Sequence, residues 1–250
     1  MTGQGRGCIA RSTSANGLTA TAGKASAGML LFEQDLPTEQ VRSAGFSQWR
    51  RTRRGGHSTM ESNLLELLTR LGPAGQAPRL DAGAERVAAV LIPLLASEPG
   101  HPVLFTRRAA SMRRHAGEIC LPGGRLEPAD QGSVIRAALR ESYEEIGLPP
   151  ANVSSCWALP PCQNSRGDLI HPVLGVVNRP RRWRLQAEEV AGLLEVPLAH
   201  FLQPQHYKLE RRCYEGQDKQ SLVLDYGGEQ IWGLTARIMD ALRLLLLAEG

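Results

Sequence analysis

The pattern of hydrophobic and polar positions predicts alternating strands and helices over most of the chain. Apolar or alternating runs bounded by glycine, proline and polar turns predict six strands. These strands cover residues 86–95, 103–107, 153–159, 169–177, 207–214 and 220–225. A turn at Pro99 and Gly100 joins the first two, and the last two form a hairpin around Glu215 and Gly216.

Apolar residues at helical spacing predict four helices. The first follows an N-cap at Ser62 and carries leucines from Leu64 to Leu71. The second runs from about Gln131 to Ile146, and the last two cover residues 197–202 and 231–247. The second helix carries its apolar residues at Ile135, Leu139, Tyr143 and Ile146. This order of elements fits a mixed sheet with helices on both faces, which is an α/β fold.

The second helix also carries three glutamates on the side opposite its apolar residues. At about 100° per residue, Glu141 and Glu145 lie one turn apart and Glu144 lies close beside them. Like charges this close raise the pKa of their neighbours unless a cation sits among them. Carboxylate oxygens suit Mg²⁺ or Mn²⁺, and Mg²⁺ is usually held by one or two carboxylates together with substrate phosphates. The cluster therefore predicts a metal site, although glutamate-rich helix faces are most often just solvated.

The residues around this cluster fit the same chemistry. Arg140 lies one turn before Glu144 and can hold it in an i,i+4 pair. Ahead of the helix, Gly123 and Gly124 remove side chains where the backbone must come close to something, and the carbonyl of Gly124 could bind the same metal.

Taken together, the double glycine, the following loop and the REx₂EExGL pattern resemble the signature box of the Nudix hydrolases. The matching residues are Gly124, Arg140, Glu141, Glu144, Glu145, Gly147 and Leu148. The resemblance implies an α/β/α sandwich that hydrolyses a nucleoside diphosphate linked to another group, with Glu141 and Glu145 as the first metal ligands and Glu144 as the second rank. The loop here is longer than the generic one and lacks its glutamate, and either Asp130 or Glu127 could replace that residue.

A second informative stretch, residues 104–124, places five basic side chains in a short loop between two strands beside the predicted metal helix. They are Arg107, Arg108, Arg113, Arg114 and His115. Cations beside a metal site suggest a polyanionic substrate, whereas the alternative is a solvated surface loop.

This stretch resembles the signature of the coenzyme A pyrophosphatase branch of the Nudix hydrolases. The matching residues are Leu104, Thr106, Arg108, Ala109, Arg114, Gly117, Pro122, Gly123 and Gly124. Leu121 and Ala109 stand where that branch usually has phenylalanine and serine. The resemblance implies that Arg108 and Arg114, with Gly123 and Gly124, bind a coenzyme A-like nucleotide.

Two later segments also resemble this branch. In the region around Glu189, a glutamate outside the box can approach the metal, although a loop acid that merely faces water is the alternative. The segment Trp232-Gly233-Leu234-Thr235-Ala236 resembles the C-terminal end of the branch, and we interpret it as packing rather than chemistry.

Composition separates an N-terminal tail, residues 1–59, from a Nudix domain over residues 60–250. The tail is rich in Gly, Ser, Thr, Ala and Arg, has no sustained apolar period, and is predicted to be disordered. Its eight Lys or Arg and three acids give the tail a net charge of +5. Because the net charge of the whole chain is +4, residues 60–250 carry −1. The basic balance therefore does not predict nucleic-acid binding by the domain. A transit peptide, a phosphate-binding segment around Trp49, and a true start at Met60 are the alternatives for the tail.

The compartment is inferred from what the sequence lacks. No apolar run reaches the length of a membrane span, so no membrane partner is expected. The five cysteines are scattered without metal-ligand spacing, which predicts free thiols in a reducing compartment. We expect a cytoplasmic monomer or homodimer, or an organellar protein if the tail is a transit peptide.

The expected activity is metal-dependent hydrolysis of coenzyme A or a derivative to 3′,5′-ADP and 4′-phosphopantetheine. Arg140 supports the catalytic carboxylates, and either Glu144 or Glu189 accepts the proton of the attacking water. The alternatives are a Nudix hydrolase of an ADP-sugar, a dinucleotide or a nucleoside triphosphate, and a non-catalytic fold that binds a nucleotide.

Overall fold

The computed structural model describes residues 86–95, 98–214 and 217–248, together with seven single positions before them. These positions are Leu64, Leu68, Leu71, Ala74, Gly75, Ala77 and Leu80. The tail, residues 1–59, the boundary at residue 60 and the N-cap at Ser62 lie outside the described residues. Leu64 and Leu68 are helical and buried, as the leucine spacing predicts.

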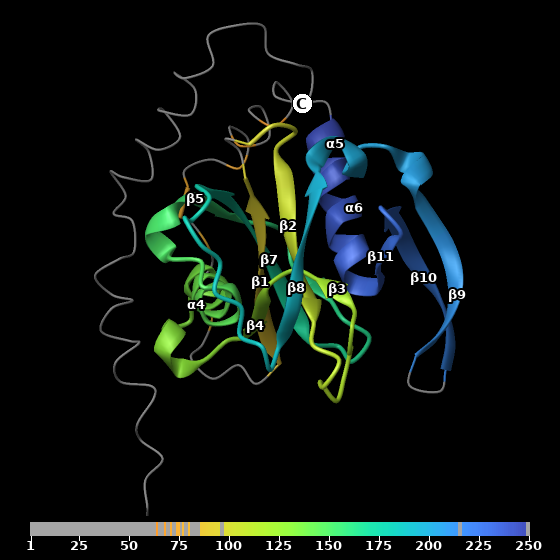
Figure 1. Ribbon diagram of the computed structural model, residues 1–250, viewed down its shortest axis with the longest axis horizontal. Helices are drawn as coiled ribbons and strands as arrows, with labels where there is room; N and C mark the ends of the chain where they lie inside the picture. The colour runs from red at the N-terminus through yellow and green to blue at the C-terminus, as the bar shows by residue number, and fades with distance from the viewer. Residues whose placement is uncertain are drawn as a thin grey trace, which may run out of the picture.

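The central feature is an eight-stranded mixed sheet (Figure 1). Its strands are β1 (Val87–Leu94), β2 (Pro102–Arg108), β3 (Ile119–Cys120), β4 (Gly123–Arg125), β5 (Val153–Ala158), β6 (Cys162–Gln163), β7 (Leu169–Val177) and β8 (Val190–Pro197). The order β3-β2-β1-β7-β5 forms the main path, while β4 pairs with β1, β6 with β7 and β8 with β2. The β1–β7 pair is parallel and all other pairs are antiparallel.

Helices cover both faces of this sheet, with α4 (Val134–Ile146) on one side and α5 (Leu198–Phe201) and α6 (Gly233–Leu247) on the other (Figure 1). Successive residues of β1 point to opposite faces, so Leu91 packs in the α4 layer and Ile92 in the α6 layer. The two buried clusters confirm the predicted α/β fold with helices on both faces of a mixed sheet.

A smaller antiparallel sheet stands beside α6 and consists of β9 (Tyr207–Tyr214), β10 (Gln217–Tyr226) and β11 (Glu229–Trp232). Figure 1 shows it at the side of the molecule away from α4. The two predicted strands are confirmed as the pair β9 and β10, whereas the predicted turn at Glu215 and Gly216 lies outside the described residues and the third strand, β11, was not predicted. Short 3-10 turns at Pro128–Asp130, Pro150–Asn152 and Pro204–His206 complete the elements.

Four local predictions are wrong. Helix α4 begins at Val134 rather than about Gln131, because Gln131 has a left-handed backbone (φ 52°) and Ser133 is the N-cap. Tyr143 does not belong to the apolar face, since 44% of it is exposed. Ile231 and Trp232 belong to β11, so α6 begins at Gly233.

The fourth error concerns Arg107 and Arg108, which lie in β2 and not in the loop. The Arg107 side chain forms an ion pair with Glu229 of β11. The four cysteines within the described residues, Cys120, Cys156, Cys162 and Cys213, are free thiols as predicted. None of the helices in that part of the chain combines the length and hydropathy that a membrane span requires.

Candidate active site

Helix α4 is held in a defined register against the sheet by its caps and its apolar face. The Ser133 hydroxyl accepts a hydrogen bond from the Arg136 amide at 3.3 Å, which caps the N-terminus. Gly147 ends the helix with a left-handed backbone (φ 67°), and its amide donates to the Tyr143 carbonyl. Because Leu139 and Ile146 are buried, the glutamates of the helix face β4 and the solvent edge.

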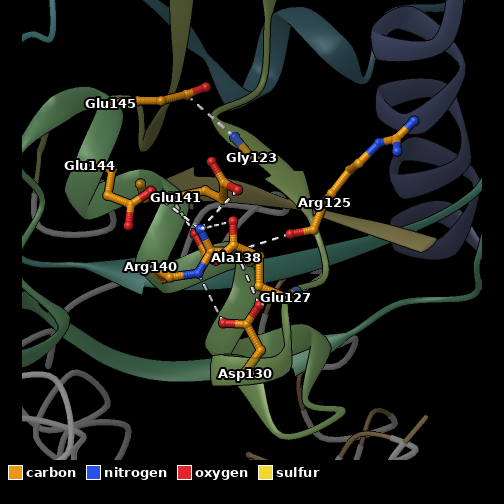
Figure 2. Close-up of polar contacts among 10 residues, drawn as sticks. Gly123, Arg125, Glu127, Asp130, Ala138, Arg140, Glu141, Glu144 and Glu145 are labelled. Carbon is orange, nitrogen blue, oxygen red and sulfur yellow. Dashed lines mark hydrogen bonds and ion pairs between the residues drawn. The ribbon is translucent and has the colours of Figure 1, made fainter. Parts of the chain in front are cut away.

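The two glycines of β4 bring its backbone against the glutamates of α4. A Cβ atom on Gly124 would lie 2.3 Å from Oε1 of Glu141, so glycine leaves the space that this carboxylate occupies. Gly123 donates its amide to Oε2 of Glu145 at 3.3 Å (Figure 2). The predicted close approach at these glycines is confirmed, and its partners are the carboxylates themselves.

Both carboxylates titrate far from their ordinary range. Burial raises the pKa of Glu141 to about 7, although the adjacent Arg140 guanidinium opposes the shift. Burial, followed by the charges of Glu141 and Glu189, raises the pKa of Glu145 to about 8. Burial also raises the pKa of Glu144, which is half-exposed. A cation bound between these carboxylates would stabilise their ionised form and lower their pKa values.

Arg140 ties the loop before α4 to these carboxylates. Its Nε and Nη2 atoms each donate to Asp130 at 3.0 Å, and Nη2 also donates to the Arg125 carbonyl at 2.9 Å. Its Nη1 atom donates to Glu141 at 3.0 Å and to Glu144 at 3.2 Å, as Figure 2 shows. The predicted i,i+4 pair with Glu144 is confirmed. These contacts make Arg140 a positioning residue, and its part in catalysis stays a prediction.

The two acids proposed to replace the missing loop glutamate have different surroundings. Asp130 is 2% exposed and accepts from Arg140 and from the Glu127 amide. The Glu127 carboxylate is largely exposed and lies 3.9 Å from Nη1 of Arg140. Asp130 therefore anchors Arg140, and neither acid contacts Glu141 or Glu145 through a recorded hydrogen bond.

The donor set of this site fits a hard divalent cation. Among the described residues, no three acid, histidine or cysteine side chains already converge on one point. Such a cage is not required, because Mg²⁺ is usually bound by one or two carboxylates together with substrate phosphates. Glu141 and Glu145 are two buried carboxylates with raised pKa values and oxygen donors, which meets that requirement.

Glu189 lies near this cluster although 44 positions separate it from Glu145 in the chain. Its charge contributes to the raised pKa of Glu145. The turn that carries it is attached to the end of β2, since the Ala109 amide donates to the Glu189 carbonyl at 2.8 Å. The expectation that a glutamate outside the box approaches the cluster is thus supported by the fold.

A cavity of about 530 Å³ adjoins the carboxylates through Gly123 and Arg108. Arg108 is half-buried at the end of β2, and no described residue accepts a hydrogen bond from its Nε atom. Its charge opposes the upward pKa shift of Glu145. Arg114 is exposed and is not among the lining residues, although its neighbour His115 is, so only Arg108 of the two predicted substrate arginines lines the cavity.

Sequence reasoning missed the opposite wall of the cavity. Its polar and aromatic residues are Asn164, Arg166, Arg212, Lys219, Trp232, Thr235 and Arg237. The Trp232 segment packs as interpreted, since Ala236 is buried in the α6 cluster and Leu234 packs against it, and the same segment also lines the cavity. No local pattern marks these side chains, since the turn before β7, the strand β10 and the helix α6 meet only in the folded chain.

Comparison with known proteins agrees with this geometry. The model of the NUDIX domain matches residues 85–215, more than half of the chain. The chain belongs to the Nudix family. It is similar to the uncharacterized Nudix hydrolase NudL of Pectobacterium atrosepticum, with 38% identity over 162 residues that cover 64% of this chain and 82% of the relative. The NudL of Salmonella paratyphi B is 37% identical over 160 residues, with coverage of 64% and 82%.

Solved structures with the same domain are more distant. The MutT NUDIX hydrolase from Burkholderia pseudomallei has a TM-score of 0.34 and 21% identity, and covers 46% of this chain and 84% of its own. The NUDIX domain of Shewanella oneidensis NrtR, complexed with ADP ribose, has a TM-score of 0.37 and 21% identity, with coverage of 56% and 86%. As a Nudix hydrolase, the chain is a diphosphatase of a family that generally depends on a divalent metal.

Proposed function

We propose that this Nudix hydrolase cleaves the diphosphate of coenzyme A or one of its derivatives. The products would be 3′,5′-ADP and 4′-phosphopantetheine or its acyl form. Mg²⁺ or Mn²⁺ would serve as the metal, since both accept the carboxylate oxygens of Glu141 and Glu145.

The observation that carries this proposal is the position of Arg108. In the sequence, it belongs to the stretch that resembles the coenzyme A pyrophosphatase branch, and in the fold it lines the cavity beside Gly123 and Glu145. A half-buried guanidinium whose buried Nε atom has no acceptor among the described residues favours an anionic ligand. A substrate diphosphate between Arg108 and the carboxylates would supply that acceptor.

The proposed chemistry divides between binding and proton transfer. Glu141 and Glu145 would hold the divalent ion, which when bound neutralises the diphosphate and lowers the pKa of a water. Arg108 would orient the diphosphate for in-line attack at phosphorus, and Arg140 would keep Glu141 and Glu144 in place. The P–O bond to the leaving phosphate breaks as the water oxygen bonds to phosphorus.

Two carboxylates could accept the proton of the attacking water. Glu144 is half-exposed, and although burial raises its pKa, its Oε2 atom is already held by a hydrogen bond from Arg140 that opposes this rise. Glu189 acts on Glu145 through its charge and has no recorded bond to Arg140. We therefore favour Glu189, and expect Glu189→Gln to lower kcat by about 10²-fold or more, with a smaller loss for Glu144→Gln.

The test is mass spectrometry of the products after separate incubation with coenzyme A, ADP-ribose, NADH and dGTP. Each substrate is used with and without Mn²⁺, and with the Glu145→Gln variant as the matched control. We expect phosphopantetheine only with metal and intact Glu145. Cleavage of another substrate in place of coenzyme A would refute the substrate assignment but remain consistent with the proposed metal site on α4. If none of the four compounds is cleaved, a nucleotide-binding role without catalysis is favoured.

A further inference from the structure

The cavity beside the carboxylate cluster is strongly cationic. Five of its lining residues are arginines or a lysine: Arg108, Arg166, Arg212, Lys219 and Arg237. Its one carboxylate is Glu118, whose Oε2 atom contacts Nδ1 of His115 at 2.9 Å. A cavity with this imbalance of charge attracts a ligand with more than one anionic group.

These cations belong to two walls. Arg108 stands with Gly123 on the wall next to the carboxylates. Lys219 and Arg212 come from β10 and β9, and Arg237 comes from α6, elements that Figure 1 shows on the other side of the sheet from α4. A ligand that touches both walls reaches from the site of hydrolysis to the C-terminal layer.

The far wall is partly pre-organised. The turn that presents Arg166 is closed by Asn164, whose Oδ1 accepts from the amides of Arg166 and Asp168, both at 2.9 Å. The Arg86 guanidinium also donates to the Arg166 carbonyl. Fixing this backbone before binding reduces the entropy that is lost when a ligand is bound.

Arg237 and Lys219 differ from Arg212 on the same wall in their surroundings. Within the described part of the chain, neither takes part in a recorded ion pair, and Arg237 donates to the Gln163 carbonyl at 3.3 Å. Arg212, by contrast, pairs with Glu210 at 3.0 Å and stacks over the Trp232 ring at 5.0 Å. The charges of Arg237 and Lys219 are therefore the ones available to a ligand, beside an apolar surface of Leu222, Leu234 and Ile238.

We infer that this wall, and Arg237 and Lys219 in particular, binds a phosphate monoester of the nucleotide that is separate from the hydrolysed diphosphate. For the identity of that group, the 3′-phosphate of coenzyme A, the inference rests on the proposed function. It replaces Arg114, which lies outside the cavity lining, as the source of specificity for the third phosphate.

Calorimetry with two nucleotides tests this assignment directly. Adenosine 3′,5′-bisphosphate and adenosine 5′-monophosphate differ only in the 3′-phosphate, and we expect the wild-type chain to bind the bisphosphate about tenfold more tightly or better. In the double variant Arg237→Gln, Lys219→Gln this ratio should fall to about one. The control is Arg211→Gln. Arg211 is an exposed residue of β9 outside the cavity lining, so this variant removes one positive charge from the sheet that carries Lys219 and should keep the wild-type ratio of affinities.

Steady-state kinetics provide a second test, because a loss of structure in the double variant would affect both substrates whereas a lost phosphate contact affects only coenzyme A. The double variant should raise KM for coenzyme A about tenfold or more, with kcat unchanged and with unchanged constants for dephospho-coenzyme A. If both compounds are cleaved and the variant keeps the wild-type preference, the inference is wrong while the proposed function stands. If neither compound is cleaved, the proposed function is wrong, and the ratio of the two affinities still decides the inference: a wild-type ratio near one, or a ratio that survives in the double variant, overturns it.

Discussion

At the scale of single residues, the site depends on the distance between β4 and the glutamates of α4. Gly124 leaves room for the Glu141 carboxylate, and the Gly123 amide donates to Glu145. Arg140 then spans Asp130 on one side and Glu141 with Glu144 on the other. Each of these contacts orients an oxygen donor, so small displacements should change metal binding more than stability.

The first prediction follows from the space at Gly124. In Gly124→Ala, the new methyl would lie 2.3 Å from Oε1 of Glu141, so the carboxylate must move while the fold is retained, since the atoms it meets end a side chain. We expect kcat to fall by about 10²-fold and the thermal unfolding midpoint to change little. Gly192→Ala is the control, because no described atom lies within 4 Å of its new methyl. Wild-type turnover by Gly124→Ala would contradict the assignment of Glu141 as a metal ligand.

A second prediction concerns the pH dependence of metal binding. The pKa values of Glu141 and Glu145, about 7 and about 8, mean that protons compete with a cation through this range. Raising the pH removes those protons, so the affinity for Mn²⁺ should increase about tenfold or more between about pH 6 and about pH 8.5. Calorimetric titration measures it, and Glu145→Gln should show a shallower dependence. Equal affinity at both pH values in the wild type would show that these acids are not ligands.

The same shifts determine the sign of a stability change in the metal-free protein. Both acids have a higher pKa in the folded chain than in the unfolded chain, so the folded state binds more protons between about pH 4.5 and about pH 8. Their contribution therefore destabilises the fold as the pH rises through this window. Bound metal should oppose that loss.

At the scale of elements, the site depends on how α4 begins and ends. The 3-10 turn Pro128–Asp130 brings Asp130 under Arg140, and the left-handed backbone of Gln131 with the Ser133 cap restarts the chain as a helix. At the other end, Gly147 turns the chain so that the Arg184 amide donates to the Ile146 carbonyl. The helix is thus fixed at both ends to loops that carry acids of the site.

The third prediction tests this C-terminal cap. A left-handed backbone costs a residue with a side chain about 1–2 kcal/mol, and a Cβ at Gly147 would also lie 2.7 Å from the Arg184 side chain. Gly147→Ala should therefore lower the free energy of unfolding by more than about 2 kcal/mol. Gly227→Ala, which has φ 60° and no described atom within 4 Å of its new methyl, carries only the backbone term. Urea denaturation compares the two, and equal losses would show that the contact with Arg184 is unimportant.

At the scale of the whole molecule, the sheet separates two buried hydrophobic clusters, one under α4 and one under α6, that support different parts of the site. The α4 cluster supports the carboxylates, whereas the α6 cluster supports the second wall of the cavity and includes Leu64 and Leu68 from the region before β1. A ligand in the cavity therefore contacts both layers. Loss of either cluster should affect binding, but only the α4 layer holds the acids of the metal site.

The fourth prediction concerns the proposed division of the chain at residue 60. A chain that begins at Met60 retains Leu64, Leu68 and the whole matched domain over residues 85–215. It should keep hydrolase activity within about twofold and lose little stability, because the composition of residues 1–59 predicts a disordered segment. Product formation and thermal unfolding of the two chains measure this. Inactivity of a folded shorter chain would show that the tail takes part in the reaction.

Much of the architecture could be predicted because it is written in local patterns. The predicted strand Leu169–Val177 matches β7 in full, and the helix predicted to carry Glu141, Glu144 and Glu145 is α4. The errors lie where tertiary contacts override local preference. Tyr143 has helical spacing with the core but is exposed, and Trp232 continues a helical pattern while pairing as a strand with Val223.

By itself, the sequence predicted the reaction class, since the carboxylates, the glycines and Arg140 lie within one stretch of about thirty residues that resembles the Nudix signature, and the helical period places the carboxylates on one face. Only the tertiary structure decided which cations share the cavity. Arg108, Arg166, Lys219 and Arg237 come from four separate parts of the chain, and their convergence depends on strand pairing and on the packing of α6. Such long-range contacts leave no period in the sequence. For this reason the sequence predicts substrate binding equally for Arg108 and Arg114, whereas in the fold only Arg108 lines the cavity.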